Sequence, residues 1–476
     1  MKKFLKVSAV AALSVTSLFA LASCGGDGEK EKVLYDPVVP VKPEDANAHA
    51  SKKEIVFYTT QGKELQELTA QAIESFETKF PGWTVKHESI GGYDKVRDKV
   101  SSDLQAGTQP DLAYCYPDHV ARYIPTKKVI DMTHFIESTD TVQGATKAYT
   151  VGYSKEEIND FVPGYYNEGK AKNFDGFKPE YAEHIVTLPF VKSTEALYYN
   201  ADVLEELKIE VPNTWEELWD ACRKIKQAYP TSTPLGYDSE ANWFITMCEQ
   251  NGWEYTSVNE PHYLFNNENT QKWLGEIKDI FGEKLFTTKT IFGGYTSDLF
   301  KKGPANSGSV FSIGSTGGAS HQSTNSFKWG VAPIPASKLA DGKLNRANIS
   351  QGPSLVMFDS QDKGNSYEKA VMTFMFVKEL LDVNFQAAFS QESGYMPSRI
   401  SSTELEAYKT WLNQENMIIP ATVKVSISMR DDYFVSPAFN GSSTARDQVG
   451  TAVKYAITGQ KTPEKALADA VRKCGK

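Results

Sequence analysis

The chain has 476 residues, a formal net charge of −9 and an apolar content of 40%. This length exceeds what one hydrophobic core usually supports, so two domains are expected. The acidic balance argues against a nucleic-acid partner and against electrostatic binding to a membrane surface.

The first 23 residues have the pattern of a secretory signal. Three lysines precede a long apolar run, and two small residues then lead into Cys24. This order predicts a signal peptide over residues 1–23. Leu21-Ala22-Ser23-Cys24 also resembles the lipobox of bacterial lipoproteins, which implies cleavage before Cys24 and a lipid anchor on its thiol. The alternative is a plain signal peptide followed by a coincidental cysteine.

Residues 24–53 are rich in glycine, proline and charged side chains, which predicts a flexible tether. No later run reaches the roughly 18 apolar residues that a membrane-spanning helix needs. The remaining cysteines have neither CxxC nor metal-type spacing, and whether any of them form a disulfide stays open: Cys115, Cys222, Cys248 and Cys474.

The folded part begins with alternating strand and helix patterns. Apolar runs at 55–59, 83–90 and 111–116 are separated by helical spacing of apolar residues, which predicts a parallel α/β sheet. Ligands of such sheets bind beyond the carboxyl ends of the strands, where Tyr116 and Asp118 follow the third run.

Residues 187–200 contain two compact apolar runs around the polar break Lys192-Ser193-Thr194-Glu195. This pattern fits one β-element that passes from one sheet to another, and it fits an ordinary strand, turn and strand within one domain. In the first case the break would face a cleft between domains, where small-molecule sites often lie.

Further along the chain, Thr214 and Glu217 have the spacing of a capping box at the start of a helix. Strand-like runs follow at 309–313, 329–334 and 355–358, and the first of them leads into a glycine-rich bend. Thr462 and Pro463 predict the start of the last helix.

The order of these motifs resembles family 1 extracellular solute-binding proteins of ABC importers. The cues, which extend over most of the chain, are Phe80-Pro81-Gly82, Ala106–Asp111, Leu188–Phe190 with Leu197–Asn200, Pro212–Leu218, Gly330–Pro335 and Ser393–Pro397. Within the family, the likeness is closest to members that bind sn-glycerol-3-phosphate.

The resemblance implies an α/β fold of the periplasmic-binding-protein type, class II, with two lobes, hinge crossovers and a ligand cleft between the lobes. Lobe one is expected at 54–190 plus 309–351, and lobe two at 191–308 plus 352–476. Closure around the ligand by hinge motion is expected.

Six positions match ligand-contacting positions of those members, and each also fits an ordinary structural role. Tyr93 follows a glycine turn, Ser193 lies in the polar break, and Ser315 lies in a bend whose amides suit an anion. The other three are Gly352, which permits close backbone approach, Tyr395, whose hydroxyl can donate, and Arg446, whose planar fork suits phosphate.

Two further candidates depart from the pattern or rest on chemistry alone. An acidic residue is expected directly after the third strand, but Pro117 intervenes and Asp118 comes one position later. Trp243 is a candidate for a stacking wall, with core packing as its alternative.

No sequence motif of a hydrolase, metalloprotease or dinucleotide-binding enzyme occurs, and no cofactor or metal is expected. The sequence therefore predicts a monomeric, lipid-anchored binding subunit outside the cytoplasm that delivers a solute to ABC permease subunits. The expected ligand is glycerol-3-phosphate or a glycerophosphodiester. The alternatives are a neutral sugar or oligosaccharide, a secreted glycoside hydrolase and a sensor protein.

Overall fold

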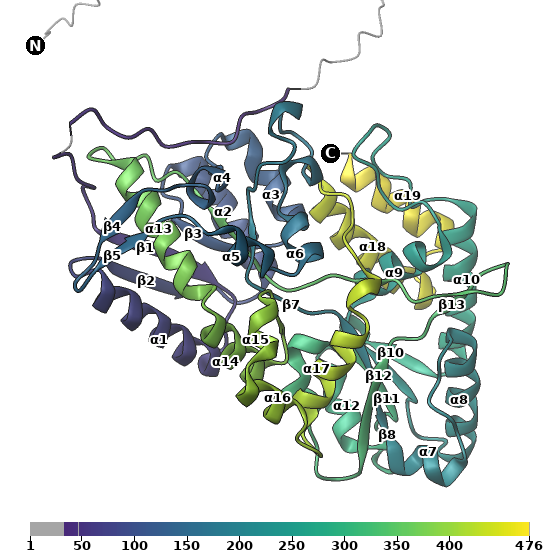
Figure 1. Ribbon diagram of the computed structural model, residues 1–476. Coiled ribbons are helices and arrows are strands. Elements are labelled where there is room, and N and C mark those ends of the chain that lie inside the picture. The colour runs from purple at the N-terminus through teal and green to yellow at the C-terminus, as the bar shows by residue number, and fades with distance from the viewer. Residues whose placement is uncertain (1–32, 46, 476) are drawn as a thin grey trace, which may run out of the picture. The chain divides into compact units, whose positions relative to one another are not determined.

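The computed structural model describes residues 33–475 except residue 46, and the chain from Leu34 onward forms one compact unit. The predicted signal peptide and Cys24 lie outside the described residues. Two five-stranded sheets, each covered by helices, form the centres of two lobes (Figure 1). The α/β, two-lobe architecture expected from the sequence is confirmed.

The first sheet has the strand order β2-β1-β3-β16-β6. Strand β1 runs parallel to β2 and β3, whereas β16 runs antiparallel to β3 and β6. The bounds are β1 Glu54–Thr59, β2 Thr84–Ser89, β3 Leu112–Cys115, β6 Leu188–Pro189 and β16 Ser354–Met357.

The second sheet has the order β10-β9-β11-β8-β12 and repeats this mixture. Strand β9 runs parallel to β10 and β11, whereas β8 runs antiparallel to β11 and β12. The bounds are β8 Glu195–Asn200, β9 Leu235–Tyr237, β10 Phe286–Thr288, β11 Phe311–Ser315 and β12 Trp329–Pro333.

Four two-stranded ladders complete the β-structure of the described residues. They are β4 Thr141–Gln143 with β5 Ala148–Thr150, β7 Val191–Lys192 with β17 Met396–Pro397, β13 Ser337–Lys338 with β14 Leu344–Asn345, and β15 Asn348–Ile349 with β18 Tyr433–Phe434.

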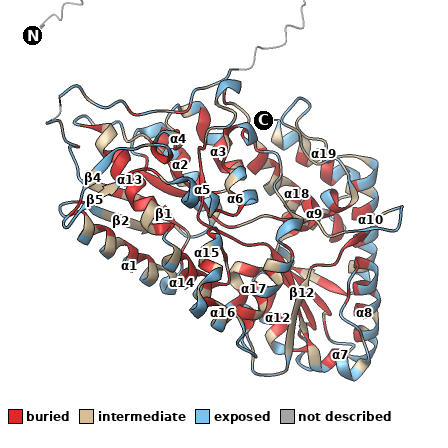
Figure 2. Ribbon diagram, in the orientation of Figure 1, coloured by how far each residue is buried: buried red, intermediate tan, exposed pale blue. Residues whose placement is uncertain are grey.

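The helices cover the sheets and supply most of the exposed surface, and their buried positions face the strands (Figure 2). Their bounds are α1 Lys63–Lys79, α2 Tyr93–Ala106, α3 Pro117–Tyr123, α4 Thr133–Ile136, α5 Lys155–Asn159, α6 Pro163–Glu168, α7 Ala201–Leu207, α8 Trp215–Ala228, α9 Glu240–Asn251, α10 Glu268–Gly282, α11 Lys289–Phe292, α12 Ser297–Lys302, α13 Ser366–Leu380, α14 Val383–Ser393, α15 Ile400–Glu404, α16 Glu406–Leu412, α17 Ile418–Ser428, α18 Ser442–Ile457 and α19 Pro463–Cys474.

Local sequence explains where several helices begin. In α8, the Thr214 hydroxyl accepts a hydrogen bond from the Glu217 amide, and the Glu217 carboxylate accepts one from the Thr214 amide. This reciprocal pair is the capping box that the sequence predicts. Helix α19 begins at Pro463 after the cap residue Thr462, as predicted.

Each lobe has its own aromatic core. In the first lobe, Phe376 of α13 packs edge-on against Phe57 of β1 and Phe76 of α1. In the second, Trp243 of α9 stacks on Tyr237 of β9, with ring centroids 4.9 Å apart. Burial of such rings dominates the stabilisation of a core, so each lobe has its own source of cohesion.

The chain passes between the lobes at residues 187–200. Strand β6 belongs to the first sheet and β8 to the second, and β7 lies between them. The polar break therefore lies at the crossing, and the interpretation as one β-element that changes sheets is confirmed. The chain returns to the first sheet between β12 and β16, and it enters the second lobe again before α18.

The expected lobe boundaries in the later part of the chain are wrong. Residues 311–333 were expected in lobe one, but β11 and β12 both pair with β8 in the second sheet. Residues 354–357 were expected in lobe two, but β16 pairs with β3 in the first sheet, and α13 packs on α1. Short buried strands carry no mark of the sheet they join, because their partners are distant in sequence.

The expected tether is also wrong for residues 34–53. The Val38 amide donates to the Val129 carbonyl at 2.7 Å, and the Tyr35 amide donates to the Gly176 carbonyl at 2.8 Å. Ala50 is buried, and its amide donates to the Glu368 carboxylate at 2.6 Å. These backbone bonds attach the segment to the first lobe despite its loop-like composition.

Candidate functional site

Two cavities share the lining residues Pro117 and 435–437, and the inner one lies where segments of both lobes meet. The inner cavity is narrow, about 20 Å³, and its wall is shared among the first lobe, the second lobe and two connecting segments. The first lobe supplies Tyr116, Pro117 and Asp118, the second supplies Tyr255, Ser442 and Arg446, and the connecting segments are residues 349–351 and 435–437.

Arg446 and Asp118 face each other across the inner cavity. Arg446 Nε lies 3.4 Å from Asp118 Oδ2, which makes the pair a direct electrostatic contact between α18 and α3. Arg446 Nη1 donates to Asn242 Oδ1 at 2.8 Å. Burial lowers the pKa of the Arg446 guanidinium, but Asp118 together with Tyr255 and Tyr116 outweighs this, and the pKa is raised overall. Arg446 is therefore held as a cation.

A buried network lies behind Arg446. Glu195 of β8 accepts one hydrogen bond from the Asn242 amide at 3.0 Å and another from the Tyr237 hydroxyl at 2.6 Å. Asn242 thus connects Glu195 to Arg446 and fixes the guanidinium from the second lobe. Burial raises the pKa of the Glu195 carboxyl to about 7, because the charged form loses its hydration.

Several polar atoms around the inner cavity are buried yet have no hydrogen-bond partner among the described residues. They are Asp118 Oδ1, Gln351 Oε1 and Ser436 Oγ, and Arg446 Nε also lacks a hydrogen bond. Unpaired buried polar atoms are uncommon in folded proteins, so their concentration around one cavity requires a local explanation. Asp118 Oδ1 and Gln351 Oε1 can only accept, so they suit a ligand with hydroxyl groups.

The predicted serines and glycine gather at the crossing beside Gln351. Ser193 pairs with Gln351 through two backbone hydrogen bonds of 2.8 and 2.9 Å, and its hydroxyl lies 3.5 Å from that of Ser315. Gly352 has φ of +91°, and a Cβ there would lie 2.5 Å from the Val191 carbonyl oxygen. The close approach that requires glycine is therefore to the chain's own backbone.

The predicted tyrosines form one aromatic row. Tyr93 stacks on Tyr116 with ring centroids 4.2 Å apart, and its hydroxyl lies 3.4 Å from that of Tyr395. Tyr116 lines the inner cavity, so the row extends from the cavity to Tyr395. Gly317 makes room for this arrangement, since a Cβ there would overlap the Tyr395 ring.

Of the predicted residues, Asp118 and Arg446 line the inner cavity directly. Ser193 and Gly352 adjoin it through Gln351, Ser315 through Ser193, and Tyr93 and Tyr395 through Tyr116. The sequence interpretation missed Asn242, Gln351, Ser436 and Tyr255, which are ordinary polar or aromatic residues without a motif. Glu195 was assigned to the polar break and given no role in the site.

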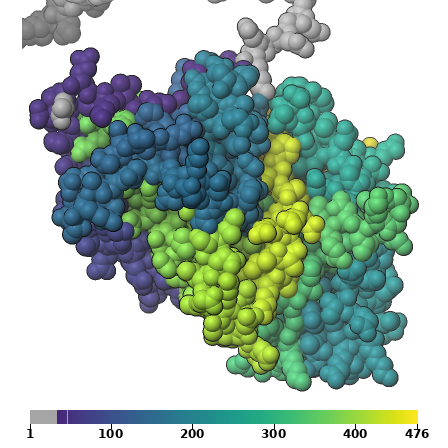
Figure 3. Space-filling model, viewed as in Figure 1, coloured from purple at the N-terminus to yellow at the C-terminus, as the bar shows by residue number. Residues whose placement is uncertain are grey.

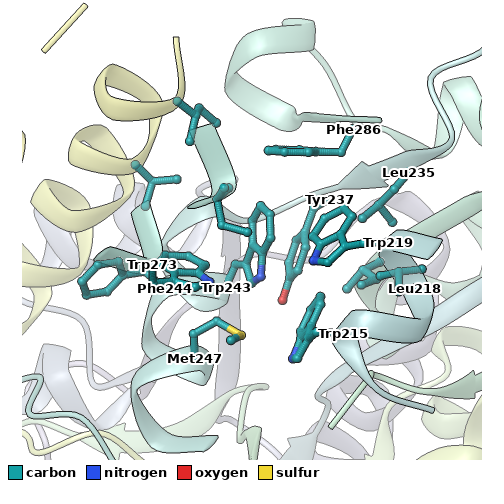
Figure 4. Close-up of a cluster of buried hydrophobic side chains, with 14 of the residues drawn as sticks. Trp215, Leu218, Trp219, Leu235, Tyr237, Trp243, Phe244, Met247, Trp273 and Phe286 are labelled. Atoms are coloured by element: carbon teal, nitrogen blue, oxygen red, sulfur yellow. The ribbon is translucent and has the colours of Figure 1, made fainter. Parts of the chain in front are cut away.

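Trp243 was predicted as a stacking wall, and the structure contradicts this. Its side chain is fully buried in the second-lobe core, where it packs against Trp215 and Tyr237 (Figure 4). Trp273 and Phe286 cover it edge-on. A ring enclosed by other rings has no free face for a ligand, so core packing explains Trp243.

The outer cavity has a volume of about 490 Å³. It shares Pro117 and residues 435–437 with the inner cavity, and its other lining residues come from α6 and the segment after it: Asn167, Glu168, Lys170, Lys172 and Asn173. The late part of the chain, yellow-green to yellow in Figure 3, lies on the surface between earlier parts of both lobes. Residues 435–437 thus line both cavities.

Comparison with known proteins identifies a family of binding proteins. Residues 71–415 match the family described as bacterial extracellular solute-binding protein. The sn-glycerol-3-phosphate-binding periplasmic protein UgpB of Yersinia enterocolitica is 22% identical over 447 residues, which is 90% of this chain and 92% of UgpB.

Solved structures share the fold at lower identity. UgpB from Mycobacterium tuberculosis in complex with glycerophosphocholine has a TM-score of 0.70 at 15% identity, over 89% of this chain and 97% of that one. Maltose-bound MalE3 of T. maritima has a TM-score of 0.68 at 18% identity, over 89% and 99% of the two chains.

Within the part of the chain that the structure describes, none of the helices has the length and apolar character that crossing a membrane requires. A family match over most of the chain, together with two lobes around a polar cleft, also confirms the prediction of a binding protein rather than an enzyme. This chain therefore belongs to the bacterial extracellular solute-binding proteins.

Proposed function

We propose that this protein captures glycerol-3-phosphate or a glycerophosphodiester and delivers it to the permease. The observation that carries the proposal is Arg446, a cation in the cavity wall whose Nε has no hydrogen bond among the described residues. A guanidinium in this state suits a phosphate oxygen, because charge-assisted hydrogen bonds to phosphate are among the strongest in proteins.

The neighbouring acceptors suit the rest of such a ligand. Asp118 Oδ1 and Gln351 Oε1 are unpaired acceptors, and a glycerol moiety carries hydroxyls that can donate to them. Ser193, Ser315, Tyr395 and the Gly352 amide are the proposed further donors to the phosphate when the cleft closes. The relatives named for glycerol-3-phosphate and the neighbour with glycerophosphocholine support this ligand class.

A neutral sugar is the second candidate. Asp118 offsets the charge of Arg446 at 3.4 Å, and a charge-balanced pair with unpaired acceptors can also bind sugar hydroxyls. The maltose-bound neighbour with the same fold supports this alternative.

Calorimetry on the purified full-length protein separates the two candidates. The ligands are glycerol-3-phosphate, glycerophosphocholine, maltose and a xylo-oligosaccharide. We expect at least one phosphate compound to bind and both neutral sugars to bind more weakly or not at all. Micromolar binding of a sugar, with neither phosphate compound bound, would refute the phosphate assignment and leave the family assignment intact.

We further propose that the mature protein is a monomer held at the outer face of the cell membrane by lipid on Cys24, beside its permease. The support is the lipobox-like sequence before Cys24 and the extracellular family. The variant Cys24→Ser should leave the membrane fraction, while Cys474→Ser, a matched thiol change near the far end of the chain, should stay there. Retention of the Cys24→Ser protein in membranes would count against a lipid anchor.

A further inference from the structure

The outer cavity has the size of a small-molecule site, whereas the inner cavity has room for about one water molecule. Both contact Pro117 and residues 435–437. Arg446 lines the inner cavity, whereas Lys170 and Lys172 line the outer one.

The charge around the outer cavity is positive. Lys170 and Lys172 lie 2.8 and 2.7 Å from the two oxygens of Glu183, whose side chain is 63% exposed and which lies outside the cavity wall. Glu168 lines the cavity, but its carboxylate is paired with the buried Lys192. Lys170, Lys172 and Lys192 carry three positive charges, and Glu168 and Glu183 carry two negative charges. These ion pairs therefore have a net charge of +1.

The cavity also lacks what a quaternary ammonium group requires. Such groups bind against aromatic faces, and none of the nine lining residues of the outer cavity is aromatic. Asn173 lines the cavity and donates through Nδ2 to the Asn167 carbonyl at 2.6 Å, and its side-chain oxygen can only accept. Amides and lysines together suit hydroxyl or anionic groups.

We propose that the outer cavity receives the distal group of a glycerophosphodiester and selects a hydroxylated or anionic group over a quaternary ammonium. This inference rests on the proposed function. It makes glycerophosphocholine, the ligand of a neighbour with the same fold, a poorer ligand here than a diester ending in a polyol.

Calorimetry on the purified full-length protein tests the selection with glycerol-3-phosphate, glycerophosphoglycerol and glycerophosphocholine. We expect glycerophosphoglycerol to bind about tenfold more tightly than glycerophosphocholine, since charges near a protein surface interact by about 1 kcal/mol or more at contact distance. Lys172→Gln should reduce that ratio by about threefold. Lys178→Gln should leave it unchanged, because Lys178 pairs with Asp36 and lines neither cavity.

The outcomes separate the two proposals. Equal or tighter binding of glycerophosphocholine would overturn the selection and leave the proposed function standing. A ratio that Lys172→Gln does not change would show that the distal group does not reach the outer cavity, and would overturn the inference as well. Failure of all three phosphate compounds to bind would refute the proposed function, and the selection with it.

Discussion

Two neighbouring residues of α18, Arg446 and Asp447, each contact a charged residue of the first lobe, but the surroundings of the two contacts differ. Asp447 lies 3.3 Å from Arg97 of α2, and that arginine also contacts Asp94 and Asp98 of its own helix. Arg446 instead meets one carboxylate, Asp118, through its Nε at 3.4 Å, and this Nε makes no hydrogen bond among the described residues.

The two regions differ in their acids: those around Arg97 are between 43% and 69% exposed, whereas Asp118 is 9% exposed. The arginines themselves are 8% exposed at position 97 and 24% at position 446. Arg97 is charge-compensated by three solvent-exposed acids, and salt screens such contacts. Arg446 has one buried carboxylate as its partner, and one oxygen of that carboxylate has no hydrogen bond among the described residues. The Arg97 region therefore joins the lobes, and the Arg446 region is left available for a ligand.

The strongest test of this comparison is Arg446→Ala. We expect a loss of about 2–5 kcal/mol of binding free energy for the phosphate ligand, which is roughly 30-fold to several thousand-fold in affinity. Arg446→Lys should recover only part, because an ammonium keeps the charge but lacks the planar fork. The control is Arg472→Ala on α19, whose arginine is 69% exposed. Unchanged affinity in the Arg446→Ala protein would show that Arg446 does not bind the ligand and that its region does not differ from the Arg97 region in this respect.

The second test examines the network that holds Arg446. The pKa of Glu195 is raised to about 7 from 4.5, so between these values the folded protein binds a proton that the unfolded chain has released. Stability must then fall as pH rises from about 4.5 to about 7, by on the order of 3 kcal/mol for this group. Glu195→Gln cannot titrate and should lack this part of the pH dependence.

Chemical denaturation at pH 5, 6, 7 and 8 measures the effect as the difference between the two proteins. That difference should change across the window and become constant above it. A constant difference at all four pH values would show that Glu195 is not protonated in the folded state, and that Asn242 is oriented by an anion.

The smallest effect on ligand affinity is expected at the pair Arg97 and Asp447. A double-mutant cycle of Arg97→Ala and Asp447→Ala should give a coupling of about 0.2–1 kcal/mol in ligand affinity, falling further in high salt. Isothermal titration at two salt concentrations provides the four affinities. A coupling as large as the loss in Arg446→Ala would mean that both regions serve the ligand equally.

How far the sequence predicts this molecule depends on the range of the interactions involved. Local signals were reliable: the capping box at Thr214 and the polar break at Ser193 are confirmed because neighbouring residues determine them. The sheet assignment of residues 311–333 failed because pairing with β8 joins segments more than a hundred residues apart. Nothing in a short apolar strand identifies such a partner.

The candidate site shows the same difference between what neighbouring residues determine and what distant contacts determine. Arg446 was predicted from the resemblance and Asp118 from its place after the third strand, and the two meet at the inner cavity. Trp243 failed because aromatic residues suit a core and a binding wall equally well until their neighbours are known. Gln351 and Ser436 could not be found from sequence, since their unpaired atoms are significant only after both lobes are placed.

The position of β16 has a consequence for how the chain folds. This strand, at Ser354–Met357, lies between β3 and β6, so the first sheet stays split until about three-quarters of the chain is available. The second lobe likewise waits for α18, whose side chains complete its core. Such long-range closure slows folding. Neither lobe can therefore complete its core before most of the chain has been synthesised.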